Sequence, residues 1–416
     1  MKRILLLSYH FPPLSVIASL RAQAFAKWLG ASGWDVTVVA PNWADESKEV
    51  QEIQGDGFRL LALPILHLAN ARNSPIKTFL QYQKGHFDLH ARLPEFRRQE
   101  LAFLRELHAS ESFDVLFGIY SPHYHLEHCH LLSQEWGIPY VLDFRDLWDP
   151  RVLGNNPRLT RKERLQWRLI QSYWKRWTSG AMLISTVSEP YARFIGELSG
   201  RPTVTITNGF EADLFSKVVR QPQEGFVVAH VGSFYPQQQV EFLFEAVAKV
   251  LHVIPHIQLH FVGVKDTVMQ KRLEHLGTTF GLTDHLTIEG RLPRAEALQR
   301  MVDSDVLYYP AWCEYEGVYS GKIFEYLASG RPIAVAPGDG GIVDALMQET
   351  GAGKPFSTAV ALGNWLTDLH AGKNLPQRNE SAIQHYTRQR QVEHFGRLLN
   401  QVYLGEDDQN ESTEGE

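Results

Sequence analysis

Two successive series of short apolar segments, each followed by a segment of helical periodicity, constrain the fold of this chain most strongly. Apolar runs of this length without polar alternation are typical of strands buried on both faces of a parallel sheet. In the first half of the chain they cover residues 3–7, 36–39, 59–63, 115–119, 140–144, 182–187 and 203–207. Strands alternating with helices predict a doubly wound α/β domain.

A second series follows a polar stretch at residues 221–225. It contains predicted strands at residues 226–231, 257–262, 286–289, 306–309 and 333–336. Between the first two of these, apolar residues from Val240 to Leu251 recur at helical spacing. We therefore predict an α/β protein with two Rossmann-like domains, at residues 1–217 and 218–384, followed by a helix at residues 385–405.

The charge of the chain is concentrated at its end. Residues 406–416 hold six acidic residues and no basic one, and the rest balances at 41 Asp plus Glu against 41 Lys plus Arg. We predict a disordered acidic tail at 406–416 and an electrically neutral body, which does not fit nucleic-acid binding.

The sequence carries no sign of a secreted or membrane-spanning protein. Its two cysteines have neither metal-site nor disulfide spacing, and its N-terminal apolar run is too short for a signal peptide. No segment reaches the roughly 18 apolar residues that span a bilayer. We expect a cytoplasmic protein and leave open peripheral contact with the inner face of a membrane.

The segment from Ser320 to Pro332 carries the strongest functional signal. It reads as a loop, a helix and a turn into a buried strand, and Lys322 and Glu325 share a helix face because they are three residues apart. A carboxylate there can accept hydrogen bonds from sugar hydroxyls, while an ammonium group and a helix N-terminus can bind phosphate. The alternative is a surface ion pair of little energetic consequence.

Ionisable residues also follow a predicted strand of the first domain. Asp143, Arg145 and Asp146 come at the end of the strand at 140–144, where parallel sheets bind ligands. They predict a binding site, with a locally salt-bridged turn as the alternative. Nearby, four histidines lie between His123 and His130, but their spacing does not suit a metal, so we expect no metal site and assign only His123 to the site.

Two loops after predicted strands differ in glycine content. The loop at residues 8–19 contains no glycine, which argues against a dinucleotide site. The loop after the strand at 226–231 begins with Gly232 and Ser233, whose backbone amides could bind a diphosphate. Arg291 follows another strand and is a further candidate for phosphate binding, with a solvated loop cation as the alternative.

Taken in order, these motifs resemble glycosyltransferase family four. The resemblance rests on the opening F-P-P loop with Arg21, a D-F-R-D-x-W motif that points to a subgroup, the N-G-x-D-x-x-F-like segment at residues 208–215, and the segment from Ser320 to Pro332. It implies a GT-B fold, with two domains facing a cleft and a C-terminal helix that crosses back to the first domain. The first domain would bind the acceptor and the second the nucleotide sugar.

The resemblance also implies roles for single residues. Glu325 would bind the ribose of the donor, and the full donor site would comprise Gly232, Ser233, Arg291, Glu316, Gly321, Lys322 and Glu325. Asp143, Arg145, Asp146 and His123 would form the catalytic and acceptor site. The sequence departs from the family pattern at residues 16–19, which replace a Gly-Gly pair, at Asp143, where relatives have histidine, and at Glu316, which is one position early.

The activity implied is transfer of a sugar from a nucleotide-diphosphate sugar to a glycan, lipid-linked or small-molecule acceptor. We expect retention of configuration, no cofactor or metal, and a setting in cell-surface polysaccharide or glycolipid biosynthesis. The alternatives are a GT-B sugar-nucleotide epimerase or hydrolase and a non-catalytic nucleotide-sugar-binding relative. Residues 151–177, with eight basic residues against Glu163 and three tryptophans, are either a membrane-surface helix or a helix packed on the first domain.

Overall fold

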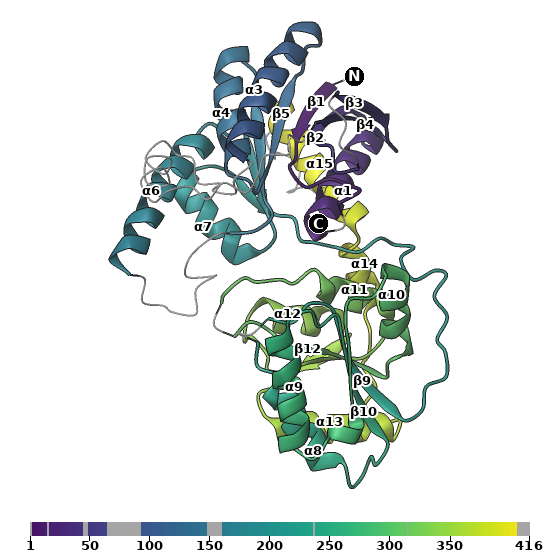
Figure 1. Cartoon of the computed structure of the whole chain (residues 1–416). Coiled ribbons are helices and arrows are strands. Elements are labelled where there is room, and N and C mark those ends of the chain that lie inside the picture. The colour runs from purple at the N-terminus through teal and green to yellow at the C-terminus, as the bar shows by residue number, and fades with distance from the viewer. Residues whose placement is uncertain are drawn as a thin grey trace, which may run out of the picture. The chain divides into compact units, whose positions relative to one another are not determined.

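The computed structural model describes residues 2–14, 16–44, 49–64, 93–147, 160–235, 238–313 and 315–405. The chain forms two compact units (Figure 1): Met1–Thr207 together with Arg388–Glu416, and Asn208–Thr387. The predicted tail at residues 406–416 lies outside the described residues. Residues 65–92, which follow the first three predicted strands, also lie outside them.

The described part of the first unit contains an eight-stranded sheet in the order β3-β4-β2-β1-β5-β6-β7-β8. Its strands are β1 (Lys2–Leu7), β2 (Trp34–Pro41), β3 (Gln51–Gln54), β4 (Phe58–Leu63), β5 (Val115–Tyr120), β6 (Tyr140–Phe144), β7 (Leu183–Thr186) and β8 (Thr203–Thr205). Its helices are α1 (Ile17–Ala31), α3 (Leu93–Ser110), α4 (Tyr124–Trp136), α6 (Arg161–Thr178), α7 (Glu189–Ser199) and α15 (Arg388–Leu404).

The central strands of this sheet are parallel and apolar on both faces, as the sequence predicts. Ile4 of β1 pairs with Val36 of β2 on one side and with Val115 of β5 on the other. The one strand that the apolar pattern did not predict is β3, which pairs antiparallel with β4 at the edge. Its sequence QEIQ is polar and mostly exposed, so it carries no burial signal.

The C-terminal helix belongs to the first unit, which confirms the crossing helix. Phe395 of α15 is fully buried, and its ring contacts those of Phe25 and Phe117 at centroid distances of 5.1 and 5.3 Å. The predicted single helix at 385–405 is wrong in detail, because α14 (Glu380–His385) ends in the second unit and α15 begins only at Arg388.

The second unit contains a sheet of six strands among its described residues, in the order β11-β10-β9-β12-β13-β14. They are β9 (Phe226–Val231), β10 (Ile257–Val262), β11 (Leu286–Glu289), β12 (Val306–Tyr309), β13 (Ile333–Val335) and β14 (Gly353–Pro355). The helices are α8 (Glu241–Val250), α9 (Thr267–Thr279), the short 3-10 helix η1 (Thr283–His285), α10 (Arg294–Asp303), α11 (Lys322–Ser329), α12 (Ile342–Thr350), α13 (Ala359–His370) and α14. Two Rossmann-like domains are thus confirmed.

The boundary between the units lies ten residues before the predicted one. The chain passes from the first unit to the second between Thr207 and Asn208, whereas the sequence placed this point between residues 217 and 218. The reason is packing: Phe210 is buried in the core of the second unit, and its backbone pairs with Thr387 in an isolated parallel bridge. The polar stretch after residue 217 therefore lies within the second unit.

Candidate functional site

Each sheet has one point where the strand order reverses, and ligands of doubly wound sheets bind beyond the carboxyl ends of strands at such points. In the first unit this point lies between β1 and β5, and in the second between β9 and β12. Most of the residues that the sequence singled out follow these strands or their neighbours. The units are described separately below.

In the second unit, Lys322 lies beside the loop that follows β9. It is the first residue of α11 and is 9% exposed. Its Nζ donates a hydrogen bond to the Ser233 carbonyl oxygen and lies 3.2 Å from His230 Nε2. Burial lowers the pKa of Lys322 to about 7, with the nearby Glu325 carboxylate opposing this effect. Among the described residues, this buried ammonium group has no carboxylate ion-pair partner.

His230 completes this arrangement, and the sequence analysis missed it. Its Nδ1 faces the Tyr308 carbonyl oxygen at 3.1 Å, so Nδ1 carries the proton and Nε2 is free to accept from Lys322. Burial, and then the charge of Lys322, hold the pKa of His230 well below its usual value, so the ring is neutral. The only available sequence signal is a histidine within an otherwise apolar strand, VVAHV.

Glu325 lies one helical turn after Lys322, as its spacing predicts. Its Oε1 accepts a hydrogen bond from Arg294 Nη2 at 2.9 Å, and its side chain is 14% exposed while that of Arg294 is 48% exposed. A half-exposed partner of this kind contributes little stability and can be displaced by a ligand. Arg294 opens α10 and was also missed, because nothing local in the sequence relates it to α11.

The N-termini of α11 and α12 differ in how their backbone amides are used. No side chain in the described part of the chain caps α11, which begins after Gly321. At α12, by contrast, Asp339 accepts hydrogen bonds from the amides of Gly341, Val343 and Asp344. The glycine-rich turn before α12 is therefore occupied by its own carboxylate.

The loop after β9 requires glycine at its first position. Gly232 has φ +132°, and a Cβ there would lie 3.1 Å from Lys322 Cε. Gln238 of this loop is buried and donates to the Pro310 carbonyl oxygen at 2.8 Å. Gln238 thus fixes the loop, and Lys322 supplies the positive charge at this edge of the sheet.

The remaining predicted donor-site residues are less closely grouped. Ser233 is exposed beside Lys322, and Gly321 directly precedes α11. Arg291 is exposed after the edge strand β11, which two strands separate from β12. Glu316 is exposed in the loop between β12 and α11. No contact between Arg291 or Glu316 and Lys322 is found among the described residues.

In the first unit, Asp143 does not face a binding site as expected. It is fully buried, and it accepts hydrogen bonds from Arg21 Nε at 2.9 Å, Arg21 Nη2 at 2.6 Å and Ser185 Oγ at 2.7 Å. Arg21 also donates to the Thr207 carbonyl oxygen at 3.1 Å. Both carboxylate oxygens are engaged, so Asp143 holds α1, β6 and β7 together rather than presenting a free oxygen to a ligand.

Arg145 and Asp146, by contrast, come at the carboxyl end of β6 and reach the surface. Arg145 is half-buried, and its buried Nε has no hydrogen-bond partner among the described residues. Asp146 is exposed, yet partial burial of its carboxyl raises its pKa, with Arg145 opposing the rise. His10, which follows β1 and was not predicted, interacts electrostatically with Arg145.

Three of the four histidines lie in two distinct environments. His123 is 5% exposed, and its Nδ1 accepts a hydrogen bond from Trp174 Nε1 at 2.9 Å. His125 and His128 share the fully buried Glu100, at 3.3 and 2.9 Å from its two oxygens. Burial would raise the pKa of Glu100, but the two histidines outweigh it and hold the pKa at about 2. Glu100 was not predicted, since α3 is distant in sequence. No metal-binding cluster occurs in the described ranges.

The basic aromatic segment forms α6, which packs on the first unit. Trp167, Trp174 and Trp177 are buried, while the basic residues Arg164, Arg168, Lys175 and Arg176 are exposed. This arrangement fits the interpretation of a packed helix with a solvated basic face. None of the helices in the described part is long and apolar enough to cross a membrane.

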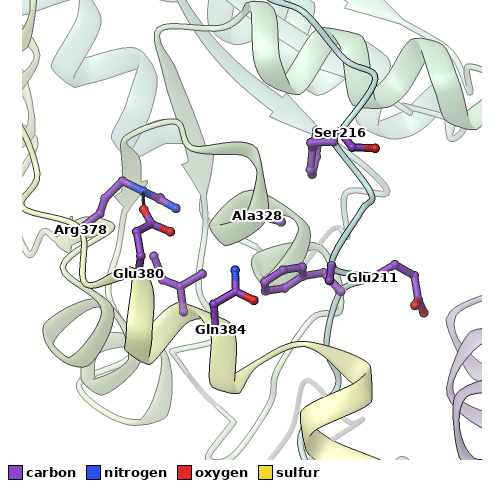
Figure 2. A pocket seen from close by; sticks show the side chains of 10 residues that line it. Glu211, Ser216, Ala328, Arg378, Glu380 and Gln384 are labelled. Atoms are coloured by element: carbon purple, nitrogen blue, oxygen red, sulfur yellow. Dashed lines mark hydrogen bonds and ion pairs between the residues drawn. The ribbon is translucent and has the colours of Figure 1, made fainter. Parts of the chain in front are cut away.

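A cavity of about 250 Å³ lies at the other end of α11 from Lys322 (Figure 2). One side is formed by the segment from Phe210 to Ser216, and the other by α14 and Arg378. Arg378 Nη2 donates to the Leu327 carbonyl oxygen at 2.8 Å, and its Nε donates to Glu380 at 2.8 Å. Its guanidinium thus ties the C-terminal end of α11 to α14, and the cavity is separate from the Lys322 site.

Comparisons with known proteins agree with this architecture. A family model described as "Glycosyl transferase 4-like domain" matches residues 18–209, and one described as "Glycosyl transferases group 1" matches residues 225–365. A search of curated protein sequences found no match. The two family models fall on the two units in turn.

Solved structures with a similar fold cover nearly the whole chain. Sucrose-phosphate synthase from Thermosynechococcus elongatus is 18% identical with a TM-score of 0.69, and the match covers 97% of this chain and 100% of that one. HepE from Anabaena in complex with UDP-glucose is 16% identical with a TM-score of 0.59, covering 96% and 100%. A UDP-N-acetylglucosamine 2-epimerase from Listeria monocytogenes, described as putative, is 11% identical with a TM-score of 0.53, covering 98% and 98%.

At these identities the structural matches speak for the fold alone, which is that of GT-B proteins. The family models add the activity, because both describe glycosyl transferases and together they cover most of the chain. The chain therefore belongs to the glycosyl transferase 4-like proteins of the GT-B fold, and it is a glycosyltransferase.

Proposed function

We propose that the second unit binds a nucleotide-diphosphate sugar at Lys322 and Glu325. The observation that carries this proposal is a buried ammonium group at the strand-order reversal, with a pKa of about 7 and no carboxylate ion pair in the described part of the unit. Burying such a group is costly, and a diphosphate would supply the missing negative charge. HepE, which shares the fold, was solved with UDP-glucose, so UDP-sugars are the first donors to test.

In this proposal the sugar C1–oxygen bond to the diphosphate breaks, a bond from C1 to an acceptor hydroxyl oxygen forms, and the hydroxyl proton passes to the departing diphosphate. Lys322, the N-terminus of α11 and Arg291 stabilise the charge that develops on the departing phosphate, without a resident metal. Glu325 accepts hydrogen bonds from the ribose hydroxyls, displacing Arg294. Gly232, Ser233, Gly321 and Glu316 complete the donor site, and the anomeric configuration is retained.

The acceptor, a glycan, a lipid-linked sugar or a small molecule, binds in the first unit near Arg145, Asp146 and His123. The biological setting that we propose, by family analogy, is hexosyl transfer in cell-surface polysaccharide or glycolipid assembly. The exposed basic face of α6 would suit peripheral contact with an anionic membrane surface.

The test begins with thermal unfolding in the presence of UDP, GDP, ADP and their glucose conjugates, because a ligand that binds only the folded state raises the melting temperature. We expect the matching nucleotide sugar to stabilise the protein, and Glu325→Gln to weaken its binding about tenfold or more, since a charged acceptor of hydrogen bonds is lost. Glu296→Gln, an exposed carboxylate on α10, is the matched control.

Turnover is then followed with isotopically labelled donor. Label in a new glycoside supports transfer, and nuclear magnetic resonance of the early product reports whether configuration is retained. Label recovered as an epimer or as free sugar would instead indicate the epimerase or hydrolase activity. Equal donor binding and turnover in wild type, Lys322→Met and Glu325→Gln would remove the assignment of this site. Chelation of metals should leave turnover unchanged.

A further inference from the structure

The strand-order reversal of the first unit gathers several polar groups. His10 follows β1, Ser121 follows β5, and Arg145 follows β6, which are three neighbouring strands. Their carboxyl ends lie at one edge of the sheet, where doubly wound folds bind ligands.

Arg145 is the unusual member of this group. The Nε of its guanidinium is buried and makes no hydrogen bond, and no ion pair to Arg145 occurs among the described residues. Leaving a buried donor unpaired is unfavourable, and native structures seldom do so. The fork formed by Nε and one Nη matches the oxygens of a phosphate or carboxylate. The geometry therefore points to an anionic ligand.

Two buried carboxylates of the first unit are engaged by other side chains. Asp143 is committed to Arg21, and Glu100 is committed to His125 and His128. Neither carboxylate forms an ion pair with Arg145 in the described part of the chain.

Two further groups interact electrostatically with Arg145. Asp146 interacts with it electrostatically but forms no ion pair with it. His10 is neutral at pH 7, because burial and then the charge of Arg145 lower its pKa to about 4, while a hydrogen bond with the Ser121 backbone opposes this. A neutral imidazole can donate one hydrogen bond to an anion that the neighbouring guanidinium attracts.

We propose that the acceptor of this glycosyltransferase carries a phosphate group and that Arg145 binds it beside His10. The proposal rests on the proposed function, because it names the chemical class of the acceptor. The phosphate belongs either to a soluble sugar phosphate or to the headgroup of a lipid-linked acceptor. Recognition uses the Nε–Nη fork of Arg145, with the His10 ring as a neighbouring donor.

His10 itself provides the readout. The protein is labelled with ¹³C at histidine, and the His10 signal is assigned through the His10→Gln variant. Saturating inorganic phosphate should raise the pKa of His10 from about 4, because a nearby anion favours the imidazolium form. Arg145→Gln should weaken phosphate binding about tenfold or more and abolish most of the rise. Arg145→Lys, which keeps the charge but loses the fork, should fall between.

Arg168→Gln, an exposed cation on α6, is the control and should respond as wild type does. In the same spectra, unchanged signals of His123 and His125, which are buried in the first unit, show that this unit is folded in each variant. If phosphate leaves the pKa of His10 unchanged, or if wild type and Arg145→Gln bind phosphate equally, the proposal is wrong. If phosphate acts as expected but no nucleotide stabilises the protein, the proposed donor function fails and the anion site stands.

The two sources of phosphate are separated by competition. The first competitors are vesicles of phosphatidylcholine with phosphatidic acid and vesicles of phosphatidylcholine alone. If only the former displace inorganic phosphate from wild type, the phosphate belongs to a lipid headgroup. The second competitor is glucose 6-phosphate. If it displaces inorganic phosphate when vesicles do not, and if it is glycosylated faster than glucose, the acceptor is a soluble sugar phosphate. Both outcomes support the proposal, whereas glucose accepted as well as glucose 6-phosphate with no vesicle competition contradicts it.

Discussion

At the scale of single residues, the protein keeps one charge buried without a counter-ion and another fully compensated. Lys322 has only neutral hydrogen-bond partners, His230 and the Ser233 carbonyl. Asp143, equally buried, is held by Arg21 and Ser185. The uncompensated charge is the one suited to a ligand, and the compensated one serves the fold.

Binding of the donor should therefore take up protons near neutral pH. With a pKa of about 7, Lys322 is about half protonated in the free protein at pH 7, and the diphosphate favours the ammonium form. Binding of UDP-glucose should draw up to about half a proton at pH 7 and weaken as the pH rises above 7, since the neutral amine must first be protonated.

Titration calorimetry in buffers of different ionisation enthalpy measures this proton uptake. Lys322→Met should show none. Proton uptake that persists in Lys322→Met would contradict the assignment. A constant affinity for UDP-glucose from pH 6.5 to about 9 would also contradict it, because the affinity should fall roughly tenfold per pH unit above the pKa of Lys322.

The Arg21–Asp143 pair should behave in the opposite way, as part of the fold. Arg21→Met leaves the buried Asp143 carboxylate without its counter-ion and should lower the free energy of unfolding by about 3–5 kcal/mol. The double variant with Asp143→Leu should recover most of this loss. Urea unfolding measures both. For comparison, Arg193→Met, in an exposed pair with Glu189, should cost no more than about 1 kcal/mol.

At the scale of elements, the loop after β9 and the helix α11 form one unit around Gly232. Tyr326 of α11 fixes the end of β9, because its hydroxyl donates to the Val231 carbonyl oxygen at 3.0 Å and accepts from the Val231 amide at 2.8 Å. The side chain of Lys322 then runs past Gly232. A side chain at this position would displace the ammonium group that we assign to the donor.

Gly232→Ala should therefore weaken nucleotide-sugar binding by more than tenfold and also lower stability by about 1 kcal/mol or more, since φ is positive there. Gly290→Ala is a suitable control, because a Cβ at Gly290 meets nothing within 4 Å. Thermal unfolding with and without UDP-glucose reports both effects. Equal behaviour of the two variants would argue against a donor site at this loop.

The sequence predicts elements well where burial on both faces leaves an apolar run. Residues 140–144, 226–231 and 257–262 form β6, β9 and β10 with the predicted bounds. It fails for the edge strands β3 and β14, whose sequences QEIQ and GKP bury too little to be distinctive. A similar limit applies to His10, His230, Arg294 and Glu100, because their importance depends on contacts between segments distant in sequence.

At the scale of the whole molecule, α15 completes the first unit from the far end of the chain. Val392, Phe395 and Leu399 are all buried in the core that also contains β1, β2 and β5 residues. The first unit is therefore discontinuous in sequence, whereas the second is a single stretch. Damage to α15 should affect the first unit in preference to the second.

Phe395→Ala tests this. Loss of a fully buried aromatic ring that contacts Phe25 and Phe117 should cost the first unit about 3–5 kcal/mol. Stabilisation by UDP-glucose, which depends on the second unit, should persist below the lowered unfolding transition. Calorimetry with and without UDP-glucose follows both effects. A variant that unfolds like wild type, or that loses nucleotide binding while still folded, would contradict this division.

The bridge between Phe210 and Thr387 has a consequence for how such enzymes can be recombined. It joins the two ends of the second unit, so that Asn208–Thr387 enters and leaves the chain at one place. A module inserted in this manner can be exchanged by cutting at only two junctions, next to Thr207 and Arg388. If the second unit binds the donor as we propose, chimeras built across these junctions would transplant donor preference between relatives while the first unit is kept.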